Sequence, residues 1–362
     1  MSLLIGVLVN KRILQRNIRG TPTFERLPLY ARAAAELGVG VVFFHPGGVR
    51  LRRRRVVGYV PAAEGGFKKR TLPLPKVVHK RGLFRMRRDV RVIKGLERLR
   101  VVIYNPDISW DKYDIHRILA AEPSLRPHLP ETVPSRRRSY AWFRERLLAG
   151  REVFVKPRTG SLGLGVARVY RVGPGRYCYE SRTFRRKTTL RGAWRLVRRR
   201  RGRALLQEGI PLLEDEGRRV DFRVPVQRDG DNEWRVPGIA AKRAEKHAFL
   251  TNLARGGSVH DGREVLARAF GPARAARIAA EMERVAILAA RTLNARHPYL
   301  VDFGFDIGVD REGRPYVIEA NRRDLRVLLA HSGQAEANAD LFKNPIAYGR
   351  YLLEHHERSP RN

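Results

Sequence analysis

The chain contains a single cysteine, few lysines and few acidic side chains. One cysteine, Cys178, excludes an internal disulfide and a zinc site of the cysteine-rich kind. No apolar run approaches the roughly 20 residues that span a bilayer. In the first residues, MSLLIGVLVNKR, the charges follow the apolar stretch instead of preceding it, which contradicts a signal peptide. These absences predict a cytoplasmic protein without a membrane span.

The scarcity of acids leaves a large positive charge. The 362 residues include 74 Lys and Arg against 36 Asp and Glu, a formal net charge of +38, and only 12 of the bases are lysines. A field of this sign attracts nucleic acid, anionic surfaces or an acidic substrate. The basic residues are nevertheless scattered, with runs at 52–55, 80–100, 136–138 and 182–203. A compositional excess on solvated faces is therefore the alternative to a selected polyanion site.

The length predicts two or three domains. Residues 1–107 are expected to form a small α/β domain with a parallel sheet. Its continuous apolar runs, which are typical of strands covered on both faces, lie at 3–9, 39–44, 77–79 and 101–104. A helical pattern at 23–37 ends at Gly38, a position that suits a C-terminal cap.

Residues 108–362 are expected to form a second unit with a lid subdomain at about 150–207. The expected strands are short and mostly paired by turns: 152–156 with 166–170, 204–207, 220–226 with 234–241, and 303–309 with 315–320. The expected helices are 112–121, 139–148 with Ser139 as N-cap, a helix that begins at Thr189, and 273–294.

Lys156 ends an apolar strand shortly before a glycine-rich turn. An ammonium and several backbone N–H groups at such a turn can hold a polyphosphate. The turn, Gly160-Ser161-Leu162-Gly163-Leu164-Gly165, matches neither the phosphate loop nor the dinucleotide fingerprint, because no helix is expected at its last glycine. A purely structural hairpin turn is the alternative.

Two acids, Asp306 and Glu319, lie on consecutive expected strands joined by the turn 310–313. Antiparallel pairing would bring both carboxylates to one end of one face, where the amide of Asn321 joins them. Mg²⁺ prefers such oxygen ligands, with phosphate oxygens and water completing its shell. The alternative is that both acids pair with the abundant arginines.

Two further segments can contact a nucleotide. Residues 205–210, Leu-Leu-Gln-Glu-Gly-Ile, run from a strand into a polar pair and a glycine, and can offer main-chain groups to the edge of an adenine ring. Residues 251–257, Thr-Asn-Leu-Ala-Arg-Gly-Gly, follow Lys242-Arg243 and form an anion-binding turn whose glycines allow close approach.

The order of these segments resembles the ATP-grasp superfamily over about residues 108–325. The run from Gln207 through Asp221-Phe222-Arg223 to Thr251-Asn252 and Gly256-Gly257 is similar to the endospore coat-associated (YheC/YheD-like) ATP-grasp family. The Asn-Leu-x-Arg-Gly-Gly stretch is shared with the ribosomal-protein-modifying glutamate ligases. We favour the coat-associated family, which implies a two-subdomain ATP-grasp fold behind a small N-terminal domain.

The resemblance implies a role for each candidate residue. Contacts with ATP, including a lid over its phosphates, would come from Lys112, Lys156, Gly160, Ser161, Gly163, Gly165, Gln207, Glu208, Gly209, Ile210 and Asn252. Two Mg²⁺ ions are expected at Asp306, Glu319 and Asn321. The transferring phosphate or the acyl-phosphate would meet Arg223, Arg243 or Arg255.

The implied activity is an ATP- and Mg²⁺-dependent carboxylate–amine ligation through an acyl-phosphate, linked to the spore coat or to peptide modification. The alternatives are a non-catalytic coat protein that retains the fold and a basic nucleic-acid-binding protein. Where the family continues with a small residue and Pro-Gly after Glu-x-Asn, this chain has Arg322-Arg323-Asp324-Leu325-Arg326. We expect Arg322, Arg323 and Arg326, with the lid arginines 182–203, to face one cleft and to favour an acidic small molecule or peptide as substrate.

Overall fold

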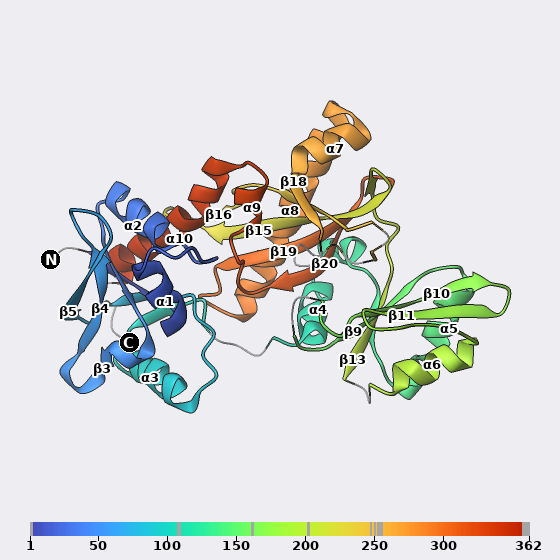
Figure 1. Cartoon of the computed structure of the whole chain (residues 1–362), viewed down its shortest axis with the longest axis horizontal. Coiled ribbons are helices and arrows are strands. Elements are labelled where there is room, and N and C mark those ends of the chain that lie inside the picture. The colour runs from blue at the N-terminus through green and yellow to red at the C-terminus, as the bar shows by residue number, and fades with distance from the viewer. Residues whose placement is uncertain are drawn as a thin grey trace.

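Three β-sheets follow one another along the longest axis of the molecule (Figure 1). The structure is a computed structural model that describes residues 3–106, 110–160, 163–200, 203–246, 248, 249, 251 and 256–356. The sheet at one end comes from the first hundred or so residues, and the sheet at the other end from residues 132–208. The sheet between them comes from residues 214–321. The α/β fold class predicted from the sequence is confirmed.

The first sheet has the strand order β3-β4-β2-β1-β6-β7, with β5 added to β4. Its strands are β1 (Leu4–Leu8), β2 (Gly40–Phe44), β3 (Val49–Arg50), β4 (Arg55–Pro61), β5 (Phe67–Pro73), β6 (Val77–Lys80) and β7 (Val102–Tyr104). Its helices are α1 (Lys11–Ile18), α2 (Leu27–Glu36) and α3 (Arg87–Arg98). Strands β2, β1, β6 and β7 are parallel, as their apolar runs predict. The antiparallel strands are not predicted from the sequence, because β5 exposes Lys68, Lys69 and Arg70 and has no apolar run.

The second sheet is antiparallel, with the strand order β12-β11-β10-β9-β13-β8. Its strands are β8 (Thr132–Pro134), β9 (Val153–Pro157), β10 (Ala167–Gly173), β11 (Arg176–Ser181), β12 (Arg185–Thr188) and β13 (Ala204–Glu208). Helix α4 (Lys112–Ala120) precedes it, and α5 (Tyr140–Leu148) and α6 (Leu190–Arg198) cover one of its faces. The predicted hairpin around the glycine turn is confirmed as β9 and β10. Ser139 does not cap α5 with its side chain, because its hydroxyl donates to the Pro134 carbonyl at 2.7 Å.

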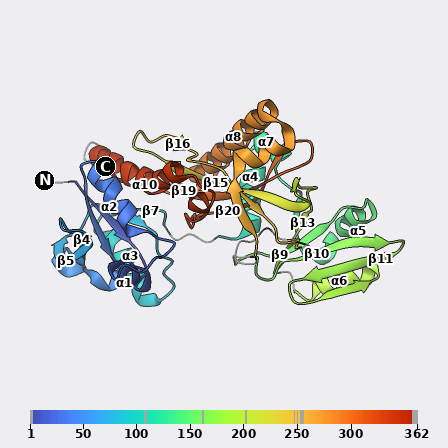
Figure 2. The ribbon, with the colours of Figure 1, turned by 45° about the horizontal axis from the view of Figure 1, so that its top comes forward.

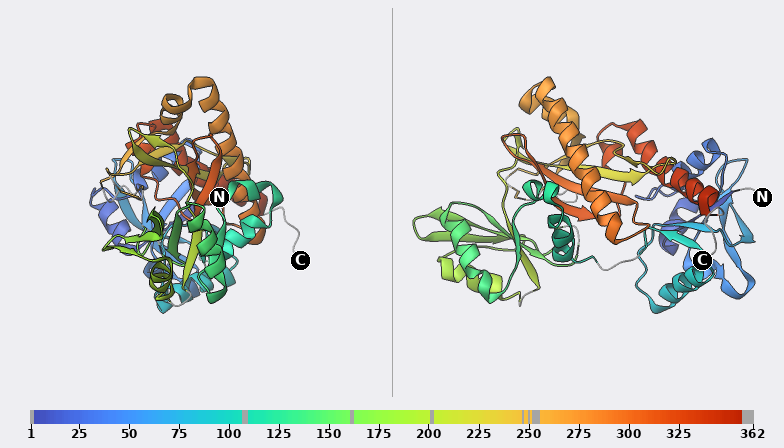
Figure 3. Two further views of the ribbon diagram at one scale, coloured as in Figure 1. Left: turned by 90° about the vertical axis from the view of Figure 1, so that its right-hand side faces the viewer. Right: turned by 180° about the vertical axis from the view of Figure 1, so that it is seen from behind.

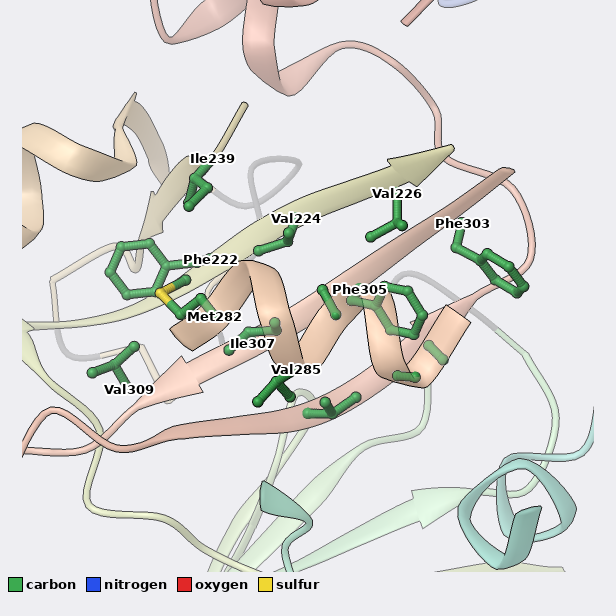
Figure 4. Close-up of a cluster of buried hydrophobic side chains, with 14 of the residues drawn as sticks. Phe222, Val224, Val226, Ile239, Met282, Val285, Phe303, Phe305, Ile307 and Val309 are labelled. Carbon is green, nitrogen blue, oxygen red and sulfur yellow. The ribbon is translucent and has the colours of Figure 1, made fainter. Parts of the chain in front are cut away.

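The third sheet packs its apolar face on a long helix (Figure 4). Its strands are β14 (Glu214–Asp215), β15 (Arg218–Arg228), β16 (Trp234–Arg235), β17 (Ala240–Arg243), β18 (Ser258–Asp261), β19 (Asp302–Val309) and β20 (Pro315–Asn321). Its helices are α7 (Gly262–Phe270) and α8 (Pro272–Arg296). Figure 4 shows Phe222 and Ile307 on the side of the sheet that carries Met282 and Val285 of α8. The predicted long helix and the hairpin β19–β20 are confirmed, whereas the strand expected at 234–241 is two short strands, β16 and β17.

The last two helices, α9 (Leu328–His331) and α10 (Ala335–His356), return the chain to the first sheet (Figures 2 and 3). Leu341 and Phe342 of α10 belong to the same buried cluster as Ile5 of β1 and Tyr30 of α2. Helix α10 thus completes the core of the first sheet. The domain boundary proposed near residue 107 and the lid boundary proposed near residue 150 stay predictions. Neither α10 nor any other helix in the described ranges is long and apolar enough to cross a membrane.

A buried ion network joins the first sheet to the third. Arg81, directly after β6, donates to Glu25 at 2.9 Å and to Asp302 of β19 at 2.8 Å. Arg326 donates to the same carboxylate of Asp302 at 2.5 Å, and Arg81 also donates to the main-chain carbonyl of Asp324 at 2.5 Å. Both arginines are only 1% exposed. Charges this deeply buried are tolerated only when they are paired, so the network fixes how the two sheets meet.

Replacing Arg81 with Met should destabilise the protein, because Glu25 and Asp302 would stay buried and lose a partner. Removing one member of a buried pair costs about 3–5 kcal/mol, which denaturant unfolding followed by circular dichroism measures. Exposed Arg88, paired with Asp89 at 3.8 Å, provides the control. Arg88→Met should cost less than about 1 kcal/mol, and equal stability of the two variants would contradict the role given to the network.

Candidate active site

The face of the third sheet that turns away from α8 is polar. Successive side chains of a strand point to opposite faces, so Asp221 and Arg223 of β15 lie opposite to the apolar Phe222. The register places Arg223 beside Asp306 of β19 and Asp221 beside Lys242 of β17. Three neighbouring strands thus gather four charged side chains, called here the polar cluster: Asp221, Arg223, Lys242 and Asp306.

A β-bulge brings Glu319 to the same face. Asp306 lies opposite Glu319, whereas Ile307, the next residue of β19, lies opposite Val317. The extra residue, Ile318, shifts the alternation of β20 by one position. Without it, Glu319 would share the α8 face with Val317. The two carboxylates that the sequence analysis pairs are therefore side by side.

The acids of the predicted metal site have cationic partners. The Nζ of Lys242 lies 2.6 Å from Oδ1 of Asp306, and the Nζ of Lys112, at the start of α4, lies 3.1 Å from Oε1 of Glu319. The Nδ2 of Asn321 donates to Oδ2 of Asp306 at 3.2 Å. The structure thus brings the three predicted ligands together. Both carboxylates pair mainly with lysines, whereas the alternative to a metal site predicts pairing with arginines.

The charges of the polar cluster shift its pKa values. Burial raises the pKa of Asp221 above its ordinary value, although Lys242 lies 2.9 Å away and opposes the shift. Burial acts on Asp306 as well, but Arg223 and Lys242 outweigh it and hold the pKa of Asp306 below its ordinary value. The pKa of Lys242 is raised, because Asp221 and Asp306 together outweigh its burial. Lys242 is therefore the cation that keeps both aspartates compatible with burial.

Arg223 reaches across β19 toward Asp324. Its guanidinium lies 3.5 Å from Asp306 and 3.7 Å from Asp324, and it donates to the carbonyl of Gly304 at 3.1 Å. A Cβ on Gly304 would lie 2.7 Å from Nη1 of Arg223 and 2.9 Å from Oδ1 of Asp324, so only glycine leaves room for this crossing. The buried Nε of Arg223 has no hydrogen-bond partner among the described residues. Such an unused donor fits an anionic ligand.

A pocket between α4, the second sheet and β20 adjoins the polar cluster. Lys112, Lys156, Gln207 and Glu319 all line it, and Lys156 donates to the side chain of Gln207. Burial lowers the pKa of Lys156 to about 8, an effect that Glu319 opposes and Lys112 reinforces. The apolar wall of the pocket consists of Ile115, Leu119, Leu129, Leu205, Val317, Ile318 and Ala320.

Three residues of the predicted adenine segment lie outside this lining. Glu208 pairs with Arg146 at 3.7 Å and with Arg151 at 3.6 Å. The N–H groups of Glu208 and Gly209 already donate to main-chain carbonyls at 2.9 Å and 2.8 Å. A main-chain contact between adenine and Glu208, Gly209 or Ile210 stays a prediction. Because the N–H groups of Glu208 and Gly209 are already used, these two residues could contact adenine only through their carbonyl oxygens.

The glycines of the predicted phosphate turn adopt left-handed backbone angles. The φ angle is 109° at Gly160, 63° at Gly163 and 75° at Gly165, a region that glycine populates without steric cost. The carbonyl of Gly165 accepts a hydrogen bond from Arg200. Ser161 lies outside the described residues. The phosphate-binding role of the turn stays a prediction.

Arg243, one of the predicted catalytic residues, lies on the other face of the sheet. It is opposite Val220, which belongs to the apolar core beneath that face. Its guanidinium lies 3.1 Å from Asp215 and 2.8 Å from Glu216. The structure does not bring Arg243 to the polar cluster, where the neighbouring Lys242 takes its place.

Asp221 and Lys242 are site residues that were not predicted from the sequence. Alternation along β15 would have placed Asp221 on the face of Arg223, but the pairing of β15 with β17 cannot be read from the sequence. Thr251, at the predicted anion-binding turn, donates to Asp221. Asn252 and Arg255 of the same turn lie outside the described residues.

The predicted ligands suit a hard cation in kind. Within the described ranges, no group of three or more His, Cys, Asp and Glu is placed to hold a metal ion. Asp306 and Glu319 supply two carboxylates and Asn321 an amide oxygen. Mg²⁺ is commonly held by one or two carboxylates, with substrate phosphates and water completing its octahedron. The residues therefore fit a Mg²⁺ ion that is bound together with a nucleotide.

The arginines after Asn321 do not all face the site. Arg326 is buried, pairs with Asp302, and so belongs to the network that joins the first and third sheets. Arg323 donates to the main-chain carbonyl of Arg81 at 2.6 Å. The expectation that Arg326 lines a cleft for an acidic substrate is wrong, because its charge is already compensated inside the protein.

Comparison with solved structures defines the class of the fold. The ATP-grasp ligase PsnB, in complex with a minimal precursor, has a TM-score of 0.53 at 13% identity, covering 96% of this chain and 100% of that one. The D-cycloserine synthetase DcsG also has a TM-score of 0.53, at 17% identity, covering 96% and 99%. The chain has the ATP-grasp fold.

Sequence comparison then identifies the family. The YheC/D-like ATP-grasp family matches residues 100–352, and the chain belongs to it. Endospore coat-associated protein YheD of Bacillus subtilis (strain 168) is 27% identical over 314 residues, which cover 82% of this chain and 67% of YheD. Endospore coat-associated protein YheC of the same strain is 22% identical over 253 residues, 67% of each chain. The resemblance inferred from the motifs is confirmed.

Replacing Lys242 with Met should destabilise the protein in a pH-dependent way. The ion pairs of Asp306, whose pKa is lowered, stabilise the fold above the unfolded pKa of about 4 and are lost as the pH falls through the folded value. In the variant, the buried carboxylates lose their cation. We expect a loss of about 3 kcal/mol at pH 7 that shrinks near pH 4, where protonation removes the unpaired charges.

Thermal unfolding of parent and variant between pH 4 and pH 8 measures this difference. Exposed Lys246 provides a matched control, because Lys246→Met removes the same charge from the surface. A pH-independent loss in Lys242→Met would show that the lysine stabilises through packing alone.

Proposed function

We propose that the protein is an ATP- and Mg²⁺-dependent carboxylate–amine ligase that works through an acyl-phosphate. One observation carries the proposal: the pocket that holds Lys112 and Lys156 is also lined by Glu319, which lies opposite Asp306. Cations beside paired carboxylates are the groups that bind a nucleoside triphosphate with its metal. The ATP-grasp family and fold support the same conclusion. A non-catalytic coat protein that keeps the fold is the alternative.

Each group has a defined task in this proposal. The apolar wall of the pocket takes the adenine, and Lys112 and Lys156 hold the α- and β-phosphates. Asp306, Glu319 and Asn321 hold two Mg²⁺ ions, which offset the charge that develops during phosphoryl transfer. Because Lys112 is paired with Glu319, its ammonium is already beside the carboxylate that binds the metal and has only to turn toward the phosphates.

The substrate carboxylate or its phosphate is proposed to meet Arg223. The guanidinium is oriented by Asp324 and by the carbonyl of Gly304, and its Nε makes no hydrogen bond within the described part of the chain. The net charge of +38 supports an acidic small molecule or peptide as substrate. The coat-associated relatives support a role connected with the spore coat, and a cytoplasmic location stays a prediction.

Mg·ATP should stabilise the protein, and Glu319 should carry the magnesium-dependent part of the effect. A ligand that binds only the folded state adds about 2.7 kcal/mol at 100 times its Kd. Thermal unfolding with Mg·ATP, compared with ATP plus EDTA, measures this shift. In Glu319→Gln the shape is kept and the charge is lost, so the Mg²⁺-dependent shift should vanish and ATP turnover should fall at least about 100-fold.

The exposed Glu312, in the turn of the same hairpin, provides the control for this experiment. Glu312→Gln removes the same charge away from the pocket and should match the parent in both measurements. If Glu319→Gln also kept the full response to Mg²⁺, the carboxylate would be structural. The alternative of a non-catalytic coat protein would then be favoured.

The affinity for ATP should fall as the pH rises above 8. The pKa of Lys156 is lowered to about 8, so at higher pH the ammonium must take up a proton before it can bind phosphate. The Kd of ATP should then rise about tenfold per pH unit. In Lys156→Arg the guanidinium stays charged, and calorimetry from pH 7 to pH 9.5 should show a nearly flat Kd. A parallel rise in both proteins would place the titrating group elsewhere.

A further inference from the structure

Two parts of the chain carry nearly all of its net positive charge: residues 1–107, with 24 Lys and Arg against six Asp and Glu, and the second sheet with its helices. Residues 132–208 contain 22 Lys and Arg against four Asp and Glu. This fifth of the sequence carries a net charge of +18, nearly half of the total of +38. No acid lies between Glu180 and Glu208. A uniform compositional excess of arginine would not produce so uneven a distribution.

Helix α6 carries a stripe of arginines along its exposed side. Arg191, Arg195 and Arg198 are exposed, whereas Ala193 and Val197 face the core. The spacing of four and three residues places these arginines next to one another on the helix surface. Like charges at this spacing destabilise a helix, so the stripe is unfavourable unless an external anion compensates it.

The arginines of this stripe lack carboxylate partners within the described residues. Elsewhere around the second sheet, Arg146 pairs with Glu131 and Arg168 with Glu152 and Glu180. No such ion pair is formed by the three arginines of the stripe or by Arg186 of β12 in the described part of the chain. Some arginines around the second sheet are thus neutralised by acids, whereas those of the stripe on α6 are not neutralised by any carboxylate in the described ranges.

An aromatic ring lies near the C-terminal end of α6. Phe184 is 47% exposed and stacks on Tyr179 with 5.5 Å between ring centroids and 13° between planes. The hydroxyl of Tyr179 accepts from Arg200, just beyond the end of α6, at 3.2 Å. Arg186 lies opposite Tyr179 in the register of β11 and β12, and so points to the same face as the helix. One face of Phe184 is thus held by the protein while the ring remains open to solvent.

These residues form a surface apart from the pocket, named here the lid face: Phe184, Arg186, Arg191, Arg195 and Arg198. The helices cover the face of the sheet that carries Val155, whereas Lys156, the next residue, points to the pocket on the other face. Helix α6 lies at the end of the molecule far from the first sheet (Figures 1 and 2). A partner bound to the lid face would leave the pocket accessible.

We propose that the lid face binds single-stranded nucleic acid. The arginine stripe holds successive phosphates, for which the guanidinium offers a planar pair of donors, and Phe184 stacks on an unpaired base. A basic surface combined with a base-stacking aromatic ring is how proteins bind single strands without sequence preference. An acidic polypeptide matches the charge but leaves the exposed ring without a function. The proposal does not depend on the ligase activity.

The test measures binding of the full-length protein to a labelled 15-nucleotide oligothymidine by fluorescence anisotropy in 50–200 mM NaCl. The variant Arg191→Ser/Arg195→Ser/Arg198→Ser should bind about 100-fold more weakly at 0.1 M salt, because each lost phosphate contact reduces the salt dependence by about 0.7. Phe184→Ala should cost about tenfold. All four side chains are exposed, so thermal unfolding should be nearly unchanged.

Matched controls come from the first sheet, where Arg52, Arg53 and Lys69 are exposed and Met86 is 53% exposed. Arg52→Ser/Arg53→Ser/Lys69→Ser and Met86→Ala should bind the oligonucleotide almost as the parent does. Equal losses in the two triple variants would overturn the proposal, because binding would then follow total charge.

Poly-L-glutamate distinguishes the two kinds of polyanion. It should compete weakly with the oligonucleotide, and Phe184→Ala should not change its binding. Competition at equal affinity per charge, together with unchanged oligonucleotide binding by Phe184→Ala, would overturn the proposal in favour of an acidic polypeptide.

Discussion

The pairing of Arg81 with Asp302 is the interaction on which the rest of the structure depends. It is fully buried, and it ties the end of a parallel strand in the first sheet to the start of β19 in the third. Asp302 lies on the same strand and the same face as Asp306, and Asp324, whose carbonyl binds Arg81, also contacts Arg223. The contacts that dock the first sheet therefore also set the orientation of the candidate catalytic groups.

The parts of the site that could be predicted are those that depend on local sequence. Asp306 and Glu319 belong to one hairpin, so their meeting follows from a short turn and antiparallel pairing. Lys156 and the glycine turn likewise lie within one hairpin. The bulge at Ile318 is not visible in the sequence, yet it decides that Glu319 faces the pocket and not α8.

The rest depends on contacts between distant segments, which a single sequence does not reveal. Arg243 and Lys242 are adjacent basic residues, and only the register with β15 decides which of them reaches the polar cluster. Arg326 is one more arginine in the sequence, and its burial follows from partners that lie in the first sheet and on β19. Helix α10 was not predicted, because its sequence mixes polar and apolar residues and contains Pro345, which usually interrupts a helix.

The position of α10 has a consequence for how the chain is made. The first sheet is synthesised first, but Leu341, Phe342 and Ile346, which complete its core, follow after both other sheets. At about 5–20 residues per second, translation of the intervening chain takes on the order of tens of seconds. Throughout that interval the apolar surface around Ile5 and Tyr30 lacks its cover. During translation the first domain therefore remains incomplete and exposes apolar surface. Chaperones that bind exposed apolar segments can recognise this surface.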